Sequence, residues 1–217
     1  MRLYSYWRSS CSWRVRIGLA LKGLKYEYVA VHLRQGEQTA AQHKQRSPLG
    51  QVPVLQLTNS SGSEVLVTQS LAILQLLDDL HPEPALVPRD DPFARCRMWE
   101  LAELINAGIQ PMQNLGILQA VKGLGADPKE WASRYIKSGL TAVESMKKKT
   151  AGGFLVGNSP TVADCCLIPQ LYNARRFGID MTQFPELLQV ETACTELDAF
   201  AQAHPDRQPD AEQDAPA

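Results

Sequence analysis

Residues 9–14 read Ser-Ser-Cys-Ser-Trp-Arg, and at this stretch the chain changes from a strand pattern to a helix pattern. A strand is predicted over residues 1–7, and a helix from about Ser10 to Lys22, ending before Gly23. The first turn of such a helix has backbone N–H groups without intrahelical partners, and the helix dipole adds partial positive charge there. A thiolate, from the protein or from a small ligand, is stabilised at such a place. The junction is therefore the strongest functional signal in the sequence.

The composition is that of a globular protein with one large domain or two small ones. Of the 217 residues, 44% are hydrophobic and 21% are charged, and the formal net charge is -1. This balance gives no sign of a nucleic acid or an anionic membrane as partner, and no apolar run approaches the roughly 18 residues of a membrane helix. The five cysteines and four histidines lack the spacing of a zinc site, so no metal is expected. An odd number of cysteines without a signal-peptide pattern predicts reduced thiols and a cytoplasmic location.

Residues 1–81 alternate strand and helix patterns and form the first predicted domain. Beyond the first strand and helix, strands are predicted over residues 26–33, 52–57 and 64–67, and helices over residues 39–45 and 70–80. The resulting order, βαβαββα, is typical of an α/β unit with a mixed sheet. Tyr4 and Tyr6 share one face of the first strand, but the pattern does not decide which face that is.

A proline-rich linker over residues 82–90 separates this domain from a second, all-helical domain over residues 91–204. Residues 205–217 are rich in Pro, Asp, Gln and Ala and are predicted to form a flexible tail. The helices predicted in the second domain are a long one over residues 93–119 with a kink at Pro111, one over residues 128–149, one opened by a Thr161–Asp164 capping box, and one over residues 185–203.

Three local features of the first domain could meet in one site. They are the Ser9–Arg14 junction, Val52-Pro53 at the start of the third strand, and Gln69-Ser70 at the start of the third helix. Ser70 is expected to cap that helix, whose amino end could receive a carboxylate. A cis bond before Pro53 would leave the Val52 main chain free to pair with an extended peptide. The three features together fit a peptide-like ligand that carries both a thiol and a carboxylate.

At these residues the chain resembles the zeta-class glutathione transferases, a family that includes maleylacetoacetate isomerases. The resemblance runs from Leu3 to about Pro209, and it is carried by the segments Ser9–Ile17, Gln51-Val52-Pro53, Gln69–Ile73, Ile109–Leu115 and Arg207-Gln208-Pro209. It implies the glutathione transferase fold, with an α/β thioredoxin-like N-terminal domain and an all-α C-terminal domain. It also implies a homodimer and a cis bond before Pro53.

The resemblance further implies glutathione as cofactor and assigns roles to residues of this sequence. Ser9 or Ser10 would donate a hydrogen bond to the glutathione sulfur, with the first serine favoured as the catalytic one and Cys11 as a modulator. Arg176 matches the carboxylate-binding arginine of the family, and Arg8 lies directly before Ser9. Both are expected to bind the carboxylates of a dicarboxylate substrate. The other residues expected to hold glutathione are Gln38, Val52, Pro53, Gln69, Ser70, Gln110 and Asn114.

The activity implied by the resemblance is the glutathione-dependent isomerisation of maleylacetoacetate to fumarylacetoacetate, a step in tyrosine and phenylalanine breakdown. The thiolate would add to the cis double bond, the resulting single bond would rotate, and elimination would leave the trans isomer. Maleylpyruvate is the close rival substrate, but Asn106–Gln110 lacks the His and Arg that some relatives acting on it use. A glutathione transferase or dehalogenase acting on α-halo acids is a further alternative.

Other interpretations of the same residues stay open from the sequence alone. Cys11 could form a mixed disulfide with glutathione, although Cys11-Ser12-Trp13-Arg14 has no second cysteine and allows only a monothiol mechanism. The two leading serines could serve only as helix caps, and the two arginines could be solvated surface residues. A protein that kept the fold without the chemistry is disfavoured by the intact Ser-Ser-Cys motif.

Overall fold

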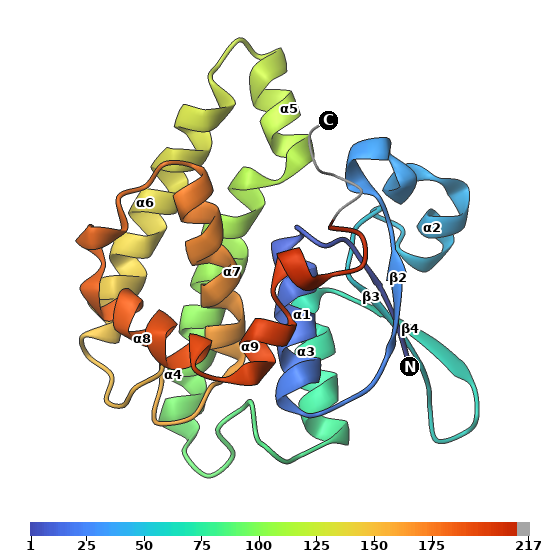
Figure 1. Ribbon diagram of the computed structural model, residues 1–217, viewed down its shortest axis with the longest axis horizontal. Helices are drawn as coiled ribbons and strands as arrows, with labels where there is room; N and C mark the ends of the chain where they lie inside the picture. The colour runs from blue at the N-terminus through green and yellow to red at the C-terminus, as the bar shows by residue number, and fades with distance from the viewer. Residues whose placement is uncertain (212–217) are drawn as a thin grey trace. The chain divides into compact units, whose positions relative to one another are not determined.

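The computed structural model of the protein describes residues 1–211, which form two compact units. The first unit is Met1–Pro84 together with residues 198–211, and the second is Ala85–Leu197 (Figure 1). The division after Pro84 falls within the stretch that the sequence predicts as a linker. No helix formed by residues 1–211 is both long enough and apolar enough to cross a membrane.

The first unit is built on a four-stranded mixed sheet. Its spatial order is β2-β1-β3-β4, and its strands are β1 (Arg2–Ser5), β2 (Glu27–Ala30), β3 (Val54–Thr58) and β4 (Glu64–Thr68). β1 runs parallel to β2 and antiparallel to β3, and β3 and β4 form an antiparallel hairpin. Parallel neighbours need a crossover connection, and α1 (Ser10–Leu21) provides it. The predicted βαβαββα order is confirmed.

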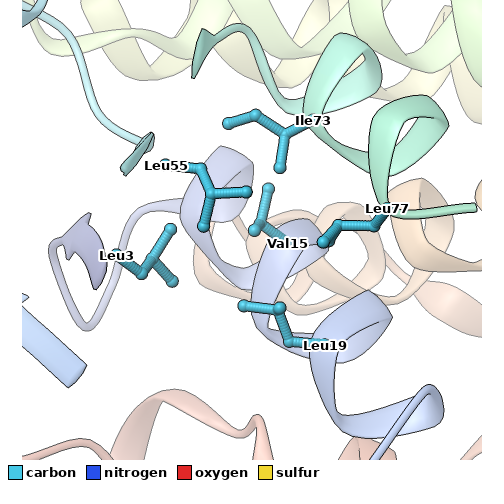
Figure 2. Close-up of a cluster of buried hydrophobic side chains, with 6 residues drawn as sticks. All are labelled: Leu3, Val15, Leu19, Leu55, Ile73 and Leu77. Carbon is cyan, nitrogen blue, oxygen red and sulfur yellow. The ribbon is translucent and has the colours of Figure 1, made fainter. Parts of the chain in front are cut away.

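Helices cover both faces of this sheet. α1 and α3 (Ser70–Leu80) lie on one face, where the strands contribute Leu3 and Leu55 to an apolar core (Figure 1). Figure 2 shows that the helices complete this core with Val15, Leu19, Ile73 and Leu77. Because side chains alternate along a strand, Tyr4 points to the other face, which α2 (Ala41–Arg46) covers. Tyr6 belongs to the same cluster, so the structure assigns the tyrosine pair to the α2 face.

The predicted last helix, over residues 185–203, is two helices that belong to different units. α8 (Pro185–Thr195) lies in the second unit, and α9 (Asp198–Gln202) packs beside α1 in the first. The apolar pattern continues across the break, which is why the sequence suggests a single helix. Short 3₁₀ turns add to these elements at Leu33–Gln35, Glu37–Thr39, Met181–Gln183 and Pro205–Arg207.

The prediction of a flexible tail needs correction for residues 205–211. Pro205 and Asp210 are buried, and the Asp210 carboxylate accepts hydrogen bonds from Trp7 and Tyr28 of the first unit. The composition of the segment suggests disorder because it is polar, but a buried carboxylate rather than an apolar side chain holds it in place. Residues 212–217 of the predicted tail lie outside the described part of the chain.

The second unit, residues 85–197, consists of helices and turns and contains no strand. Its central helix, α7 (Val162–Arg176), is buried along almost its whole length, as its apolar pattern predicts. The predicted capping box is present, and Asp164 Oδ2 accepts from the Thr161 amide at 2.8 Å. The other helices of this unit are α4 (Pro92–Glu103), α5 (Leu115–Gly123), α6 (Pro128–Lys147) and α8.

The prediction of one long helix over residues 93–119 is wrong. After α4 the backbone forms a π-helix over Leu104–Ile109 and a 3₁₀-helix over Gln110–Gln113, and α5 begins only after these. Pro111 explains the break, because a proline has no amide hydrogen and its ring clashes with the carbonyl of the fourth residue before it. The helix therefore loosens before the proline and tightens at it, instead of continuing with a simple kink.

Candidate active site

Ser9 caps the first helix and still has a hydrogen to donate. Its backbone is extended (φ -67°, ψ 116°), and its Oγ accepts a hydrogen bond from the Ser12 amide at 3.2 Å. This bond uses a lone pair of the oxygen, so the hydroxyl hydrogen remains available to a ligand. The two interpretations of Ser9, as a helix cap and as a thiol donor, are therefore compatible.

The residues that follow Ser9 differ in their exposure. Ser10 is 8% exposed and Ser12 is fully buried, whereas Ser9 and the free thiol of Cys11 are half-buried. The amides of Ser10 and Cys11 begin the helix and have no hydrogen-bond acceptor among residues 1–211. An anionic sulfur beside Ser9 would meet a hydroxyl, two unpaired amides and the positive end of the α1 dipole. Of the two serines, Ser9 is the more open to a ligand.

Arg8 directly precedes the Ser9–Arg14 motif. Its side chain is half-buried, and its guanidinium carbon lies 5.3 Å from the centre of the Trp7 ring, in a cation–π arrangement. Within the described part of the chain Arg8 has no carboxylate partner, so its positive charge is available to an anionic ligand. The role of Arg8 in binding a substrate carboxylate stays a prediction.

Val52 presents an unpaired main chain beside the sheet. The Val52-Pro53 bond is cis, which confirms the expectation from the resemblance. Neither the amide nor the carbonyl of Val52 has a hydrogen-bond partner among residues 1–211. The residue before it is fixed, because the Gln51 carbonyl oxygen lies 3.0 Å from His43 Nε2 and the Gln51 amide donates to Ser47 Oγ at 3.1 Å. The main chain of Val52 is therefore held in place but free to pair with an extended peptide.

Gln69 has a strained backbone at the start of α3. Its φ is 69° and its ψ is 115°, and it is a non-glycine residue with positive φ. Such a conformation costs about 1–3 kcal/mol and is typical of binding and catalytic positions. Gln69 is also the residue that caps α3, so the prediction that Ser70 is the cap was wrong. The turn after β4 places the cap one residue earlier than the side-chain preference for serine suggests.

A buried arginine joins Ser70 to the first helix. Arg14 Nη1 donates to Ser70 Oγ at 3.2 Å, and both residues are buried. The hydroxyl hydrogen of Ser70 remains available to a ligand, and so does its amide, which has no partner among residues 1–211. Arg14 therefore links the amino ends of α1 and α3, the two places predicted to bind the sulfur and a carboxylate.

Gln38 lies against the turn that leads to Val52. It belongs to the 3₁₀ turn Glu37–Thr39. Its carbonyl oxygen lies so close to Gly50 that a Cβ added there would be only 2.7 Å from this oxygen. Gly50 has a φ of 61°, so both its conformation and the close approach require glycine. The side-chain Oε1 of Gln38 is buried without a hydrogen-bond partner in the described residues. The structure thus brings Gln38 near Val52, but it does not present this oxygen to a ligand.

Three of the predicted site residues belong to the second unit. Gln110 is 7% exposed, and its Nε2 donates to Asn114 Oδ1 at 2.6 Å, so these two residues are brought together. Arg176 is exposed at the carboxyl end of α7. Its neighbour Arg175 forms a two-pronged ion pair with Glu191, with both bonds at 2.6 Å. Arg176 Nη1 donates to Asn173 Oδ1 at 3.3 Å, and the role of Arg176 in binding substrate stays a prediction.

A cavity of about 640 Å³ opens on the α2 face of the first unit. Its lining includes Tyr4 and Arg46, and the Arg46 guanidinium carbon lies 4.5 Å from the centre of the Tyr4 ring. None of the residues predicted to bind glutathione lines this cavity. The candidate site is therefore defined by the unpaired polar groups at Ser9, Val52 and Ser70, and not by the cavity.

Comparison with known proteins gives the family of the chain. Residues 1–79 match the model of the glutathione S-transferase N-terminal domain family. The maleylacetoacetate isomerase of Rattus norvegicus is 43% identical over 210 residues, which are 96% of this chain and 94% of the rat protein. A solved maleylpyruvate isomerase, described as a bacterial glutathione S-transferase in the zeta class, is 40% identical with a TM-score of 0.90, over 97% of this chain and 100% of that one. The chain belongs to the zeta-class glutathione transferases.

The zeta-class membership confirms the predicted fold, a thioredoxin-like first unit with a helical second part. The chain is also similar to the solved maleylacetoacetate isomerase from Anaeromyxobacter dehalogenans with GSH bound in its active site, at 53% identity and a TM-score of 0.89 over 97% of each chain. A second structure of that protein holds dicarboxyethyl glutathione and citrate in the active site, at 52% identity and a TM-score of 0.88 over 97% of this chain and 96% of that one.

The residues that hold the Ser9–Arg14 motif in place were not predicted from the sequence. Arg14 and Arg16 lie inside the predicted first helix, and both are buried. The sequence could have indicated them, because two arginines alternate with apolar residues in a helix expected to cover a sheet. A charged side chain buried there without a partner is costly. Asp210 had no such signal, since it lies in a polar segment 203 positions from Trp7, the residue that it bonds.

Proposed function

We propose that this protein is a glutathione-dependent maleylacetoacetate isomerase, which forms fumarylacetoacetate. The observation that carries the proposal is the amino end of α1, where Ser9 has a free hydroxyl hydrogen beside two unpaired amides. The names of the relatives support the choice of substrate, because the rat protein at 43% identity and the Anaeromyxobacter protein at 53% identity are both maleylacetoacetate isomerases.

The residues of the first unit fit glutathione, a tripeptide with a thiol, an extended backbone and a γ-glutamyl carboxylate. Ser9 would receive the sulfur, and the free main chain of Val52, next to Pro53, would pair with the cysteinyl backbone. Gln69 and Ser70 would take the γ-glutamyl end at the start of α3, where unpaired donors favour a carboxylate. Three further residues are proposed to contribute to glutathione binding, namely Gln38, Gln110 and Asn114.

The chemistry asks the protein to ionise a thiol and to hold a dianion. Bound glutathione supplies a thiolate that adds reversibly to the cis double bond and so permits rotation about it. Ser9 donates a hydrogen bond to the charged sulfur, which lowers the thiol pKa, and the amides of Ser10 and Cys11 add to this effect. The Cys11 side chain borders the sulfur as a modulator. Arg8 and Arg176 hold the substrate carboxylates, because a guanidinium matches the two oxygens of a carboxylate.

Maleylpyruvate is the second candidate substrate. The specific observation in its favour is the solved maleylpyruvate isomerase, which is 40% identical to this chain with a TM-score of 0.90. The two substrates share the cis double bond and differ in chain length. A comparison of kcat/KM for maleylacetoacetate and maleylpyruvate decides between them, and a higher value for maleylpyruvate would replace the proposed substrate.

We also propose that the protein is a cytoplasmic homodimer. None of the five cysteines, all within residues 1–211, forms a disulfide, which fits a reducing compartment. The dimer is proposed from the family resemblance. Sedimentation velocity should give a particle of about twice the chain mass of 24.0 kDa, and a species with the mass of one chain at all concentrations would contradict the dimer.

An absorbance assay of the cis enone tests the proposed activity. Purified protein is mixed with maleylacetoacetate, and the rate of its conversion is followed at increasing glutathione concentration. The expected rate rises with glutathione and saturates, and it is zero in its absence. A rate that does not depend on glutathione would contradict the proposal.

A further inference from the structure

Trp7 lies two residues before Ser9, and both of its backbone polar groups are bound by buried charged side chains. The Trp7 amide donates to Asp210 Oδ2 at 3.0 Å, and the Trp7 carbonyl accepts from Arg16 Nη2 at 2.9 Å. Asp210 and Arg16 are each only 1% exposed. Hydrogen bonds that involve an ionised group are roughly twice as strong as neutral ones. The chain that leads into Ser9 is therefore fixed from both sides at Trp7.

Arg16 also binds the rest of the turn that carries the motif. Its Nη1 donates to Ser5 Oγ at 3.2 Å and to the Tyr6 carbonyl at 3.3 Å, and its Nε donates to the Ala203 carbonyl at 3.1 Å. The Tyr6 carbonyl also accepts the Ser9 amide at 3.0 Å, which closes the turn. Burial lowers the pKa of Arg16 to about 10, so the guanidinium stays charged at neutral pH.

Asp210 is anchored to the sheet through its other oxygen. The Tyr28 hydroxyl, on β2, donates to Asp210 Oδ1 at 2.7 Å. Burial raises the pKa of Tyr28, so this hydroxyl keeps its hydrogen at neutral pH. Each oxygen of the carboxylate thus has its own donor, one on β2 and one at Trp7. Burying a carboxylate is costly. Here the two hydrogen bonds of the buried Asp210 carboxylate hold the C-terminal segment against Trp7, two residues before Ser9.

We propose that Asp210 is a positioning residue for the thiolate site, because its carboxylate fixes Trp7 and thereby the direction of the Ser9 hydroxyl. The proposal rests on the proposed function, since it assumes that Ser9 donates to the glutathione sulfur. Hydrogen bonds weaken steeply as their angle departs from linearity, so a small shift of Trp7 weakens the bond from Ser9. Asp210 acts through the backbone and does not touch the sulfur.

The test compares Asp210→Ala and Asp210→Asn with a matched control, Asp206→Ala. Asp206 lies in the same segment but is exposed. Three quantities are measured: the thiol pKa of bound glutathione from thiolate absorbance against pH, the glutathione Kd by calorimetry, and amide hydrogen exchange at residues 7–12. Asp210→Ala should raise the thiol pKa by about one unit, a tenfold fall in the ratio of thiolate to thiol at a given pH, and speed exchange at Trp7. The carboxamide of Asp210→Asn is a weaker acceptor and should give smaller changes in the same direction, while Asp206→Ala should match the wild type.

A purely structural role of Asp210 predicts a different outcome. It would speed exchange throughout the first unit and leave the thiol pKa of bound glutathione unchanged, and that result would overturn the proposal. If Asp210→Ala does not fold, Asp210→Asn decides, and a wild-type pKa and wild-type exchange at Trp7 would overturn it. If the wild type does not lower the thiol pKa of bound glutathione below that of free glutathione, the proposed function is contradicted. If the wild type and Asp210→Ala lower it equally, only the role of Asp210 is contradicted.

Discussion

Arg14 Nη1 donates a hydrogen bond to Ser70 Oγ at 3.2 Å, and this bond joins the amino end of α1 to the amino end of α3. Both helix starts carry serine hydroxyls whose hydrogens are available to a ligand. The distance between the proposed sulfur site and the proposed carboxylate site is therefore set in part by a side chain that touches neither. A substitution at one end should be felt at the other.

Replacing Ser70 by alanine tests this link. The change removes one acceptor of the buried Arg14 and the hydroxyl proposed for the γ-glutamyl end. We expect the free energy of unfolding to fall by about 1–3 kcal/mol, because a buried charged group loses a hydrogen bond. The glutathione Kd should rise about tenfold, which corresponds to 1.4 kcal/mol. Urea unfolding and calorimetry measure the two effects, with Ser61→Ala in the exposed hairpin loop as control. An unchanged Kd would remove Ser70 from the site.

Gly50 and Gly62 form a matched pair for testing how Gln38 and Val52 are held. Both glycines have positive φ, at 61° and 81°, but a Cβ at Gly50 would meet the Gln38 carbonyl oxygen at 2.7 Å, whereas a Cβ at Gly62 meets nothing within 4 Å. Each Gly→Ala change should cost about 1 kcal/mol or more for the conformation alone. Only Gly50→Ala should also raise the KM for glutathione. Equal effects of the two changes on KM would show that the Gln38 contact does not shape the site.

Gln69→Gly should separate stability from binding. Glycine adopts the observed φ of 69° without strain, so the variant should unfold at a higher urea concentration than the wild type. The same change removes the carboxamide proposed to hold the γ-glutamyl end, so the glutathione Kd should increase. Chemical unfolding and calorimetry on one preparation give both numbers. A variant that is more stable and binds equally well would show that the strain has no role in binding.

His204 predicts a pH dependence of stability. It packs edge-on against Trp13, with ring centres 5.2 Å apart, and burial lowers its pKa below the ordinary value of 6.5, against the attraction of Asp206. The folded protein therefore favours the neutral imidazole, and this contribution to stability is complete above pH 6.5 and is lost as the pH falls below it. His204→Gln should flatten the loss between pH 7 and pH 5, as followed by thermal unfolding. An unchanged slope would assign the dependence to other groups.

Local patterns carry the parts of the fold that the sequence predicts well. α3 begins and ends at the residues that its apolar spacing indicates, and the Thr161–Asp164 capping box forms as its spacing suggests. These features depend on neighbours within a few residues. The Ser9 cap also follows from a local motif, whereas the cis bond before Pro53 was expected from the resemblance to a known family.

The features that the sequence did not predict depend on contacts between distant residues. The bond between Trp7 and Asp210 spans 203 positions, and no periodicity indicates it. The π-helix over Leu104–Ile109 reflects the adjustment of one helix to a proline and to its packing partners, which local propensity does not capture. Gln69 takes the cap in place of Ser70 because the turn after β4 fixes the backbone there.

The most direct measurement of the central claim is the thiol pKa of glutathione bound to the wild type, to Ser9→Ala and to Ser9→Gly. Alanine at the cap should cost about 1 kcal/mol of stability and glycine only a few tenths, so the glycine variant removes the hydroxyl with little effect on the helix. We expect the wild type to hold the thiol pKa well below that of free glutathione. Both variants should raise it by one unit or more, which is about a tenfold fall in the ratio of thiolate to thiol at a given pH. Equal thiol pKa values in the wild type and in both variants would contradict the assignment of Ser9 as the group that stabilises the thiolate.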